Sequence, residues 1–141
     1  MTSIVKNLIS KNLFTLEKGT PTVKAIEVMA SHNIGSVVIT HKGELAGIIT
    51  ERDIIRGIAR GIDVNQPVEE FGTMKNLVVI GEDETIYNAV KKMAERNLRH
   101  LIVVDKYGKL KGVISVRDII RESHVLAAIS NIEREEFLGS D

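Results

Sequence analysis

Two copies of one decapeptide carry the residues of this chain that are best suited to chemistry. GIITERDIIR occupies positions 47–56 and GVISVRDIIR positions 112–121, and seven of the ten residues are identical. A hydroxyl and a carboxylate at a spacing of three can hold a polar ligand between them, or they can form a capping box at the start of a helix. Each copy contains one such pair: Thr50 with Asp53, and Ser115 with Asp118.

The capping box is the more conservative interpretation of these pairs. Its hydroxyl accepts a hydrogen bond from a backbone N–H, and its acid faces the positive end of the helix dipole. A ligand site is compatible with it, because a capped helix N-terminus is also a good place to hold phosphate. The acid in both copies is Asp rather than the Glu or Gln that reaches back best, which favours a ligand.

An arginine beside each acid also favours a ligand. Arg52 and Arg117 fall in the first turn of the predicted helices, where a cation opposes the helix dipole. A cation repeated at an unfavourable position indicates a partner. We expect this partner to be a phosphate, or an acid on the other half of the molecule.

The decapeptides close two longer repeats, which define the elements that must position these residues. TVKAIEVMA in the first repeat aligns with TIYNAVKKMA in the second, and HNIGSVVIT aligns with RNLRHLIVVD. The offset is 63 residues at Thr22 and Thr85, 64 along the following strand and 65 after the next turn. Single-residue indels fall where loops and helix ends tolerate them.

Each repeat predicts the order β-α-β-β-α. Short apolar runs indicate the first strand, and apolar residues at helical spacing indicate the helix that follows. A nearly continuous apolar run then indicates a strand covered on both faces. The predicted strands are 13–16, 36–40 and 45–49 in the first repeat, and 77–80, 101–104 and 110–114 in the second. The predicted starts of the first helices are Thr20 before Pro21, and Asp83 before Glu84.

One repeat of about 60 residues buries too little surface to be comfortably stable alone. The two repeats should therefore pack against each other with pseudo-twofold symmetry, which gives a fold of the α/β (α+β) class. We expect the first repeat to span residues 1–66 and the second 67–124, with residues 125–141 as a helical tail.

Composition narrows the classes of function. Lys plus Arg and Asp plus Glu number 19 each, so no net field favours nucleic acid, and the absence of Cys excludes thiolate catalysis and cysteine zinc sites. His32, His41 and His124 lack metal-ligand spacing, so no metal site is expected. The first ten residues mix Lys and Asn into their apolar residues and lack the apolar region expected of a signal peptide, and no apolar run approaches the ~18 residues of a membrane span. We expect a soluble, cytoplasmic protein that is not an enzyme.

The paired units, each closing with Gly-apolar-apolar-Ser/Thr-x-x-Asp, resemble a tandem pair of CBS domains, also called a Bateman module. The resemblance covers roughly residues 5–122. It implies a stand-alone regulatory module that binds an adenosine-containing ligand in clefts between the halves. It also implies a disc-like homodimer.

The resemblance assigns roles to residues of this chain. The motif acid is expected to accept hydrogen bonds from both ribose hydroxyls, while the hydroxyl residue and nearby basic residues lie on the phosphate side. The ribose partners would be Asp53 and Asp118, and the phosphate-side residues Thr50, Ser115, Arg52, Arg117, Arg99 and His100. The backbone near Leu16 and Ile80, with Val38 and Ile102, is expected to form the apolar adenine pockets.

The two sites should be unequal. Arg99 and His100 stand just before the strand LIVV, whereas the corresponding pair of the first repeat, Gly35 and Ser36, carries no charge. We expect the site that uses Asp118 and Arg99 to bind more tightly.

The resulting hypothesis is a non-enzymatic module without a cofactor. It would bind AMP, ADP or ATP between the repeats and signal energy state to an unidentified partner protein. The alternatives are an S-adenosylmethionine sensor and a structural adaptor whose pockets have decayed and which only mediates dimerisation. A nucleic-acid binder is disfavoured by the zero net charge and by an aromatic content of 4%.

Overall fold

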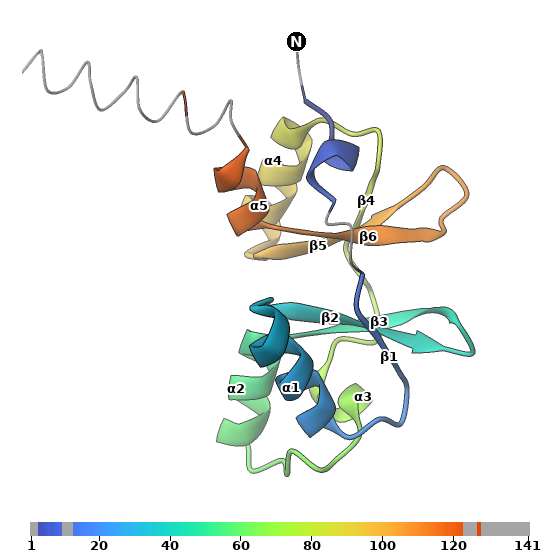
Figure 1. Ribbon diagram of the computed structural model, residues 1–141, viewed down its shortest axis with the longest axis vertical. Helices are drawn as coiled ribbons and strands as arrows, with labels where there is room; N and C mark the ends of the chain where they lie inside the picture. Colours follow the sequence, from blue (N-terminus) through green and yellow to red (C-terminus); the bar gives the residue numbers. More distant parts are fainter. Residues whose placement is uncertain (1–2, 10–12, 123–126, 128–141) are drawn as a thin grey trace, which may run out of the picture.

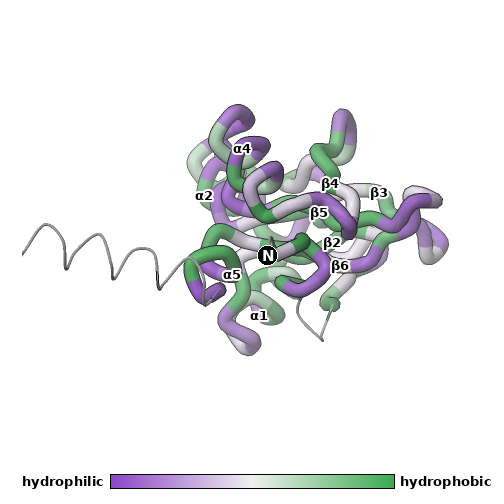
Figure 2. Tube along the Cα trace, turned by 90° about the horizontal axis from the view of Figure 1, so that it is seen from above, coloured by the Kyte–Doolittle hydropathy of each residue, from purple (hydrophilic) through white to green (hydrophobic). Residues whose placement is uncertain are grey.

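The computed structural model describes residues 3–9, 13–122 and 127. Two three-stranded sheets face each other, and helices cover the outer side of each sheet (Figure 1). The outermost turns of the molecule are mostly hydrophilic (Figure 2). None of the helices in the described ranges is long and apolar enough to cross a membrane. Apart from Ala127, the predicted helical tail lies outside the described residues.

The predicted order β-α-β-β-α is confirmed in both repeats. The first half contains β1 (Thr15–Glu17), α1 (Thr22–His32), β2 (Ser36–His41), β3 (Glu44–Thr50) and α2 (Glu51–Ala59). The second half contains β4 (Val79–Gly81), α4 (Ile86–Arg96), β5 (His100–Val104), β6 (Leu110–Ser115) and α5 (Val116–Arg121). Two short helices precede the repeats: η1 (Val5–Leu8) and α3 (Val68–Phe71).

Both sheets have the same topology, with a parallel pair followed by an antiparallel pair. In β2, Val37 and Ile39 pack with the helices in the core of the first half. Side chains alternate along a strand, so Val38 points to the opposite face, toward the other half, where it is also fully buried. Ile102 occupies the matching position in β5 and is 1% exposed. The prediction that both strands are covered on two faces is confirmed.

The opening segment of each repeat packs on the opposite half. Val5 of η1 belongs to the core of the second half, and its N–H donates to the Glu84 carbonyl (2.8 Å). Its counterpart Val68 of α3 belongs to the core of the first half, and its N–H donates to the Thr20 carbonyl (2.8 Å). In space, the start of the segment expected to form the first repeat therefore completes the second half. The two halves are interlocked.

The glycine that opens each decapeptide makes this interlocking possible. A Cβ on Gly112 would overlap the side chain of Ile9, which follows η1. A Cβ on Gly47 would likewise overlap the side chain of Met74, which follows α3. The first residue of the repeated motif therefore has a packing role, because it lets the opening segment approach the last strand of the sheet.

The predicted helix starts are displaced. α4 begins at Ile86, and its N-cap is Thr85, whose hydroxyl accepts from the Asn88 N–H (3.1 Å). The start predicted at Asp83 is wrong, because the Glu84 N–H still closes a turn onto the Gly81 carbonyl (3.1 Å). In the first half the N-cap is Pro21, one residue later than predicted.

Truncating Val5 should destabilise the whole molecule. Val5 is 0% exposed although it lies in the first helical turn of the chain. Loss of its buried methyl groups should lower the free energy of unfolding in Val5→Ala by about 1–3 kcal/mol, measured by urea denaturation. Val68→Ala should lower the free energy of unfolding by a similar amount. Val90→Ala, on the exposed side of α4, should lower it much less. A Val5→Ala protein as stable as the wild type would contradict the interlocked arrangement.

Candidate functional site

Both decapeptides pass from strand to helix through a complete capping box. In the first half, the Thr50 N–H donates to Oδ2 of Asp53 (2.9 Å), and the Asp53 N–H donates to Oγ1 of Thr50 (3.2 Å). In the second half, the Ser115 N–H donates to Oδ2 of Asp118 (2.8 Å), and the Asp118 N–H donates to the Ser115 hydroxyl (3.1 Å). Asp therefore reaches back in both boxes. The choice of Asp over Glu or Gln is therefore no evidence against a cap, and ligand contact by these residues stays a prediction.

The cap leaves part of the Asp118 carboxylate available. Its hydrogen bonds with the Ser115 N–H and hydroxyl both end on Oδ2. Oδ1 can accept from another donor, and the half-buried side chain lines the cavity described below. Capping and ligand contact are thus compatible at this residue.

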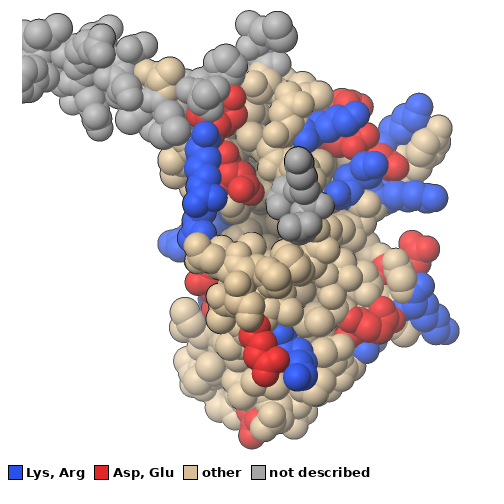
Figure 3. All heavy atoms as spheres, viewed as in Figure 1, with Lys and Arg blue, Asp and Glu red and all other residues tan. Residues whose placement is uncertain are grey.

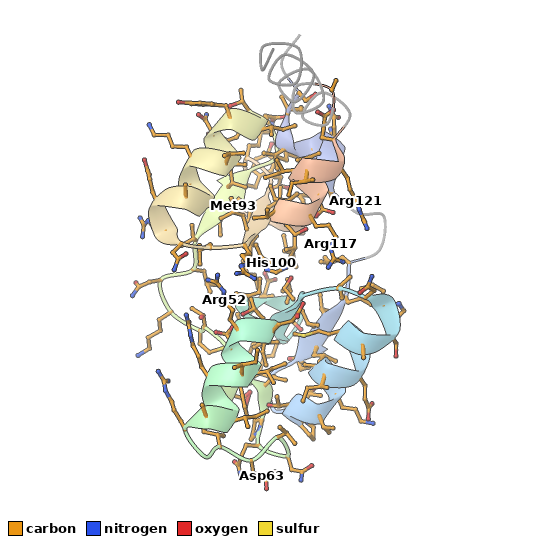
Figure 4. All side chains as sticks on the ribbon, turned by 90° about the vertical axis from the view of Figure 1, so that its left-hand side faces the viewer. Arg52, Asp63, Met93, His100, Arg117 and Arg121 are labelled. Atoms are coloured by element: carbon orange, nitrogen blue, oxygen red, sulfur yellow. The ribbon has the colours of Figure 1, made fainter. Side chains whose placement is uncertain are left out.

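The repeated arginines bind the other half of the protein. Arg52 Nη1 donates to the carbonyl of Asn97 (3.2 Å), and Arg117 Nη1 donates to the carbonyl of Asn33 (3.2 Å). Both asparagines are C-caps in the left-handed conformation, with φ of 51° and 53°. Figure 4 shows Arg52 and Arg117 on either side of His100, at the junction of the halves.

This arrangement explains why a cation is repeated at the start of a helix. Arg117 opposes the dipole of its own helix α5 but lies against the C-terminal, negative end of α1. Arg52 is related in the same way to α2 and α4. The protein partner of each arginine is therefore a backbone carbonyl and not an acid, which corrects the expectation from sequence.

A cavity of about 520 Å³ opens between the two halves. This volume lies in the range of small-molecule sites. The second half lines it with Arg99, His100, Ser115, Arg117, Asp118 and Arg121, and the first half with Phe14, His32, Asn33, Ile34, Gly35 and Glu51. Arg117 and Arg121 lie on the side of the molecule that faces the viewer in Figure 4. In Figure 3 this side is the left edge, where basic side chains form a column at the level of the junction.

The structure brings together only part of the predicted site. Ser115, Asp118, Arg117, Arg99 and His100 line one cavity. Of their first-half counterparts, Gly35 and Ser36 also line it, but Thr50, Arg52 and Asp53 do not.

The residues predicted for the adenine pockets lie elsewhere. Ile80 is part of the helix-side core of the second half, and Leu16 packs on that of the first. Val38 and Ile102 are buried between the sheets. None of the four lines the cavity, and their contact with adenine stays a prediction.

The lining residues that were not singled out in the sequence include Arg121, Phe14 and Glu51. Arg121 lies one turn after Arg117, and this i, i+4 spacing within the decapeptide was an available signal. Phe14 lies just before β1, and its ring stacks on His32 with the centroids 4.0 Å apart. Glu51 is the first residue of α2, and no pattern in the sequence shows that it reaches the cavity.

His100 is the half-buried imidazole at the centre of the cavity wall. Burial lowers the pKa of His100 below its ordinary value of 6.5. Glu51 and Asp118 act in the opposite direction, and the charges of Arg99 and Arg117 add to the lowering. The imidazole is therefore harder to protonate in the folded chain than in the unfolded chain. Among the described residues, no group of three or more His, Asp or Glu side chains could hold a metal ion.

Comparison with protein families gives a consistent match along the chain. A family model described as the CBS domain matches residues 5–60 and again residues 68–125. An uncharacterized 17.7 kDa protein of Acidianus ambivalens is 34% identical over 122 residues, which are 86% of this chain and 73% of that protein. The CBS domain-containing protein YhcV of Bacillus subtilis is 30% identical over 118 residues, 83% of each chain. Inosine-5'-monophosphate dehydrogenase of Aquifex aeolicus also matches (33% identity), but the match covers 78% of this chain and 22% of that enzyme.

Solved structures with the same fold include two that hold adenosine compounds. The CBS domain pair of protein MJ0100, in complex with 5′-methylthioadenosine and S-adenosyl-L-methionine, has a TM-score of 0.77 and 30% identity. The match covers 86% of this chain and 95% of that one. The CBS domain protein PAE2072 from Pyrobaculum aerophilum, complexed with AMP, has a TM-score of 0.80 and covers 92% of this chain and 99% of that one. At 24% identity, this second likeness concerns the fold alone.

Lowering the pH should reduce the free energy of unfolding of the wild type more than that of a variant without the His100 imidazole. Because the pKa of His100 is lowered in the folded chain, the unfolded chain binds more protons below pH 6.5. The contribution of His100 to stability is thus complete above pH 6.5 and is lost as the pH falls through the lower, folded value. The difference in unfolding free energy between wild type and His100→Gln should shrink from pH 7.5 to pH 5, measured by urea denaturation. His41→Gln, at an exposed position outside the cavity, is the matched control. A constant difference would contradict the burial of this imidazole.

Proposed function

The chain belongs to the CBS domain family, and we propose that it binds an adenosine-containing small molecule in the cavity beside Asp118. We further propose that it is a regulatory module, not an enzyme, and that occupancy of this cavity is signalled to a partner protein. The observation that carries the proposal is the composition of the cavity. One space between the halves gathers a carboxylate with a free oxygen, a hydroxyl, three arginines and an aromatic ring.

Asp118 is the ribose partner in this proposal. Its carboxylate is held in place by the capping box, and Oδ1 can accept from the ribose hydroxyls. Hydrogen bonds to a charged acceptor contribute about 1.5–3 kcal/mol each. Ser115 lies beside it at the start of α5. The apolar groups that the first half offers to the adenine are Leu13, Phe14 and Ile34.

The adenosine part is common to two classes of ligand. AMP, ADP and ATP carry phosphates, for which Arg99, Arg117 and Arg121 are the available cations. A module that binds them would report energy state. S-adenosylmethionine and 5′-methylthioadenosine, the compounds of the MJ0100 domain pair, carry a sulfur substituent in place of phosphate. Support for the adenosine moiety does not depend on which class binds.

Arg117 couples ligand binding to the relative position of the two halves. The same guanidinium lines the cavity and donates to the Asn33 carbonyl of the opposite half. A ligand that draws Arg117 toward itself would weaken this contact. It would therefore favour an arrangement of the halves in which the contact is not needed, provided that it binds that arrangement more tightly.

A structural adaptor is the second candidate, because apolar side chains are exposed on two helices. The outer face of α2 exposes Ile55 and Ile58, and that of α4 exposes Tyr87 and Val90. In Figure 4 the two helices lie one above the other along the same edge of the molecule. Such a surface suits a homodimer. A stable dimer in sedimentation experiments, together with failure to bind any adenosine compound, would favour the adaptor.

Removing the charge of Asp118 should weaken binding of the adenosine compounds. Asp118→Asn keeps a carbonyl oxygen for the capping box but loses the charged acceptor for ribose. The dissociation constant should rise roughly 10- to 150-fold, as follows from about 1.5–3 kcal/mol. Asp53→Asn makes the same change in the capping box that does not line the cavity, so it is the matched control and should have a much smaller effect.

Isothermal titration calorimetry with AMP, ADP, ATP and S-adenosylmethionine would measure these constants. Absence of binding by all four compounds to the wild type would reject the proposed function. Equal affinity in wild type and Asp118→Asn would reject the placement of ribose at Asp118.

A further inference from the structure

The cavity contains a second acid, Glu51, which the proposed function does not use. Its backbone N–H donates to the Gly35 carbonyl (3.1 Å), which fixes the first residue of α2 at the cavity wall. A Cβ placed on Gly35 would lie 2.6 Å from Oε1 of Glu51 and 3.0 Å from Cε1 and Nε2 of His100. The carboxylate and the imidazole are therefore neighbours, and they meet over Gly35, which has no side chain to separate them.

The carboxylate of Glu51 is not neutralised by the basic residues around it. Arg99, Arg117 and Arg121 line the same cavity, yet none forms an ion pair with Glu51 within 4.0 Å. In the described part of the chain, no hydrogen bond to its carboxylate oxygens is found. The charge is thus available to a ligand.

The pseudo-twofold relation shows that only the first repeat has an acid at the position of Glu51. Val116, the first residue of α5, corresponds to Glu51, and its N–H donates to the Arg99 carbonyl (2.9 Å) as Glu51 does to Gly35. Both repeats thus form the same backbone contact, but the side chains at its two ends carry different charges. Arg99 and Val116 face Gly35 and Glu51. At these positions the second half supplies a basic side chain and the first half an acidic one.

We propose that Glu51 selects the ligand by charge. It favours adenosine derivatives whose 5′ substituent carries a cationic group and disfavours those that carry phosphate there. This inference rests on the proposed function and deepens it. A substituent with both a cation and a carboxylate can meet Glu51 on one wall and Arg117 or Arg121 on the other. A phosphate gains from the arginines but is repelled by Glu51.

The test compares three ligands on wild type and Glu51→Gln by calorimetry. S-adenosylmethionine carries a sulfonium, an ammonium and a carboxylate; 5′-methylthioadenosine has no charged tail; AMP carries a phosphate. In Glu51→Gln, S-adenosylmethionine should bind about tenfold more weakly and AMP several-fold more tightly, at an effective dielectric constant of ~20. The affinity for 5′-methylthioadenosine should not change. Glu44→Gln removes one negative charge outside the cavity and is the matched control.

A second variant tests the same idea by adding charge. Val116 lines the cavity from the start of α5, where an acid is compatible with the helix dipole. Val116→Glu should strengthen the preference for S-adenosylmethionine over AMP. It also keeps the test decisive if Glu51→Gln lowers the unfolding temperature.

The outcomes separate this inference from the proposed function. Equal changes for all three ligands in Glu51→Gln, or a wild type that prefers AMP to S-adenosylmethionine, would overturn charge selection by Glu51. Asp118-dependent binding of the adenosine compounds would survive that result. Failure of the wild type to bind any of the three would instead overturn the proposed function, and charge selection with it.

Discussion

The fold depends on the mutual burial of the segments that open the two repeats. Val5 completes the core of the second half, and Val68 that of the first, so neither half has a complete core without the segment that leads into the other. Separation of the halves would expose both residues to water. The folded chain already contains both walls of the cavity. A ligand can adjust the two walls relative to each other, but it does not have to assemble them.

Electrostatic contacts at the ends of the helices also connect the two halves. Arg117 places a cation at the N-terminus of α5, and the C-terminal carbonyl of α1 at Asn33 compensates for it; Arg52 and Asn97 repeat the arrangement. Because Arg117 also lines the cavity, one guanidinium belongs both to the contact between the halves and to the candidate site. Arg52 takes part in the contact between the halves but does not line the cavity. The pseudo-symmetric contacts are therefore not equivalent in function.

Sequence was sufficient for features that are repeated or local. The two-copy motif predicted the order of elements, and the hydroxyl–acid spacing predicted both capping boxes, because a cap involves residues three apart. The protein partner of Arg117 was missed, since a backbone carbonyl 84 positions away has no signature in residue types. The position of Glu51 in the cavity was missed for the same reason. Alternation along the strand places the side chains of Leu16 and Ile80 with the helix-side cores, so contact of the backbone near them with adenine stays a prediction. Phe14, just before β1, lines the cavity.

The backbone explains how the two walls could acquire opposite charges within one fold. The contacts that hold Glu51 and Val116 run from their N–H groups to the carbonyls of Gly35 and Arg99, and neither uses a side chain. Substitution at Glu51, Val116 or Arg99 therefore keeps these backbone contacts while it alters the charge that a ligand meets. Gly35 has a further effect, since the absence of a Cβ lets the Glu51 carboxylate and the His100 imidazole approach the same point. The architecture is thus shared between the repeats, and the selectivity of the cavity resides in the few wall positions where the repeats differ.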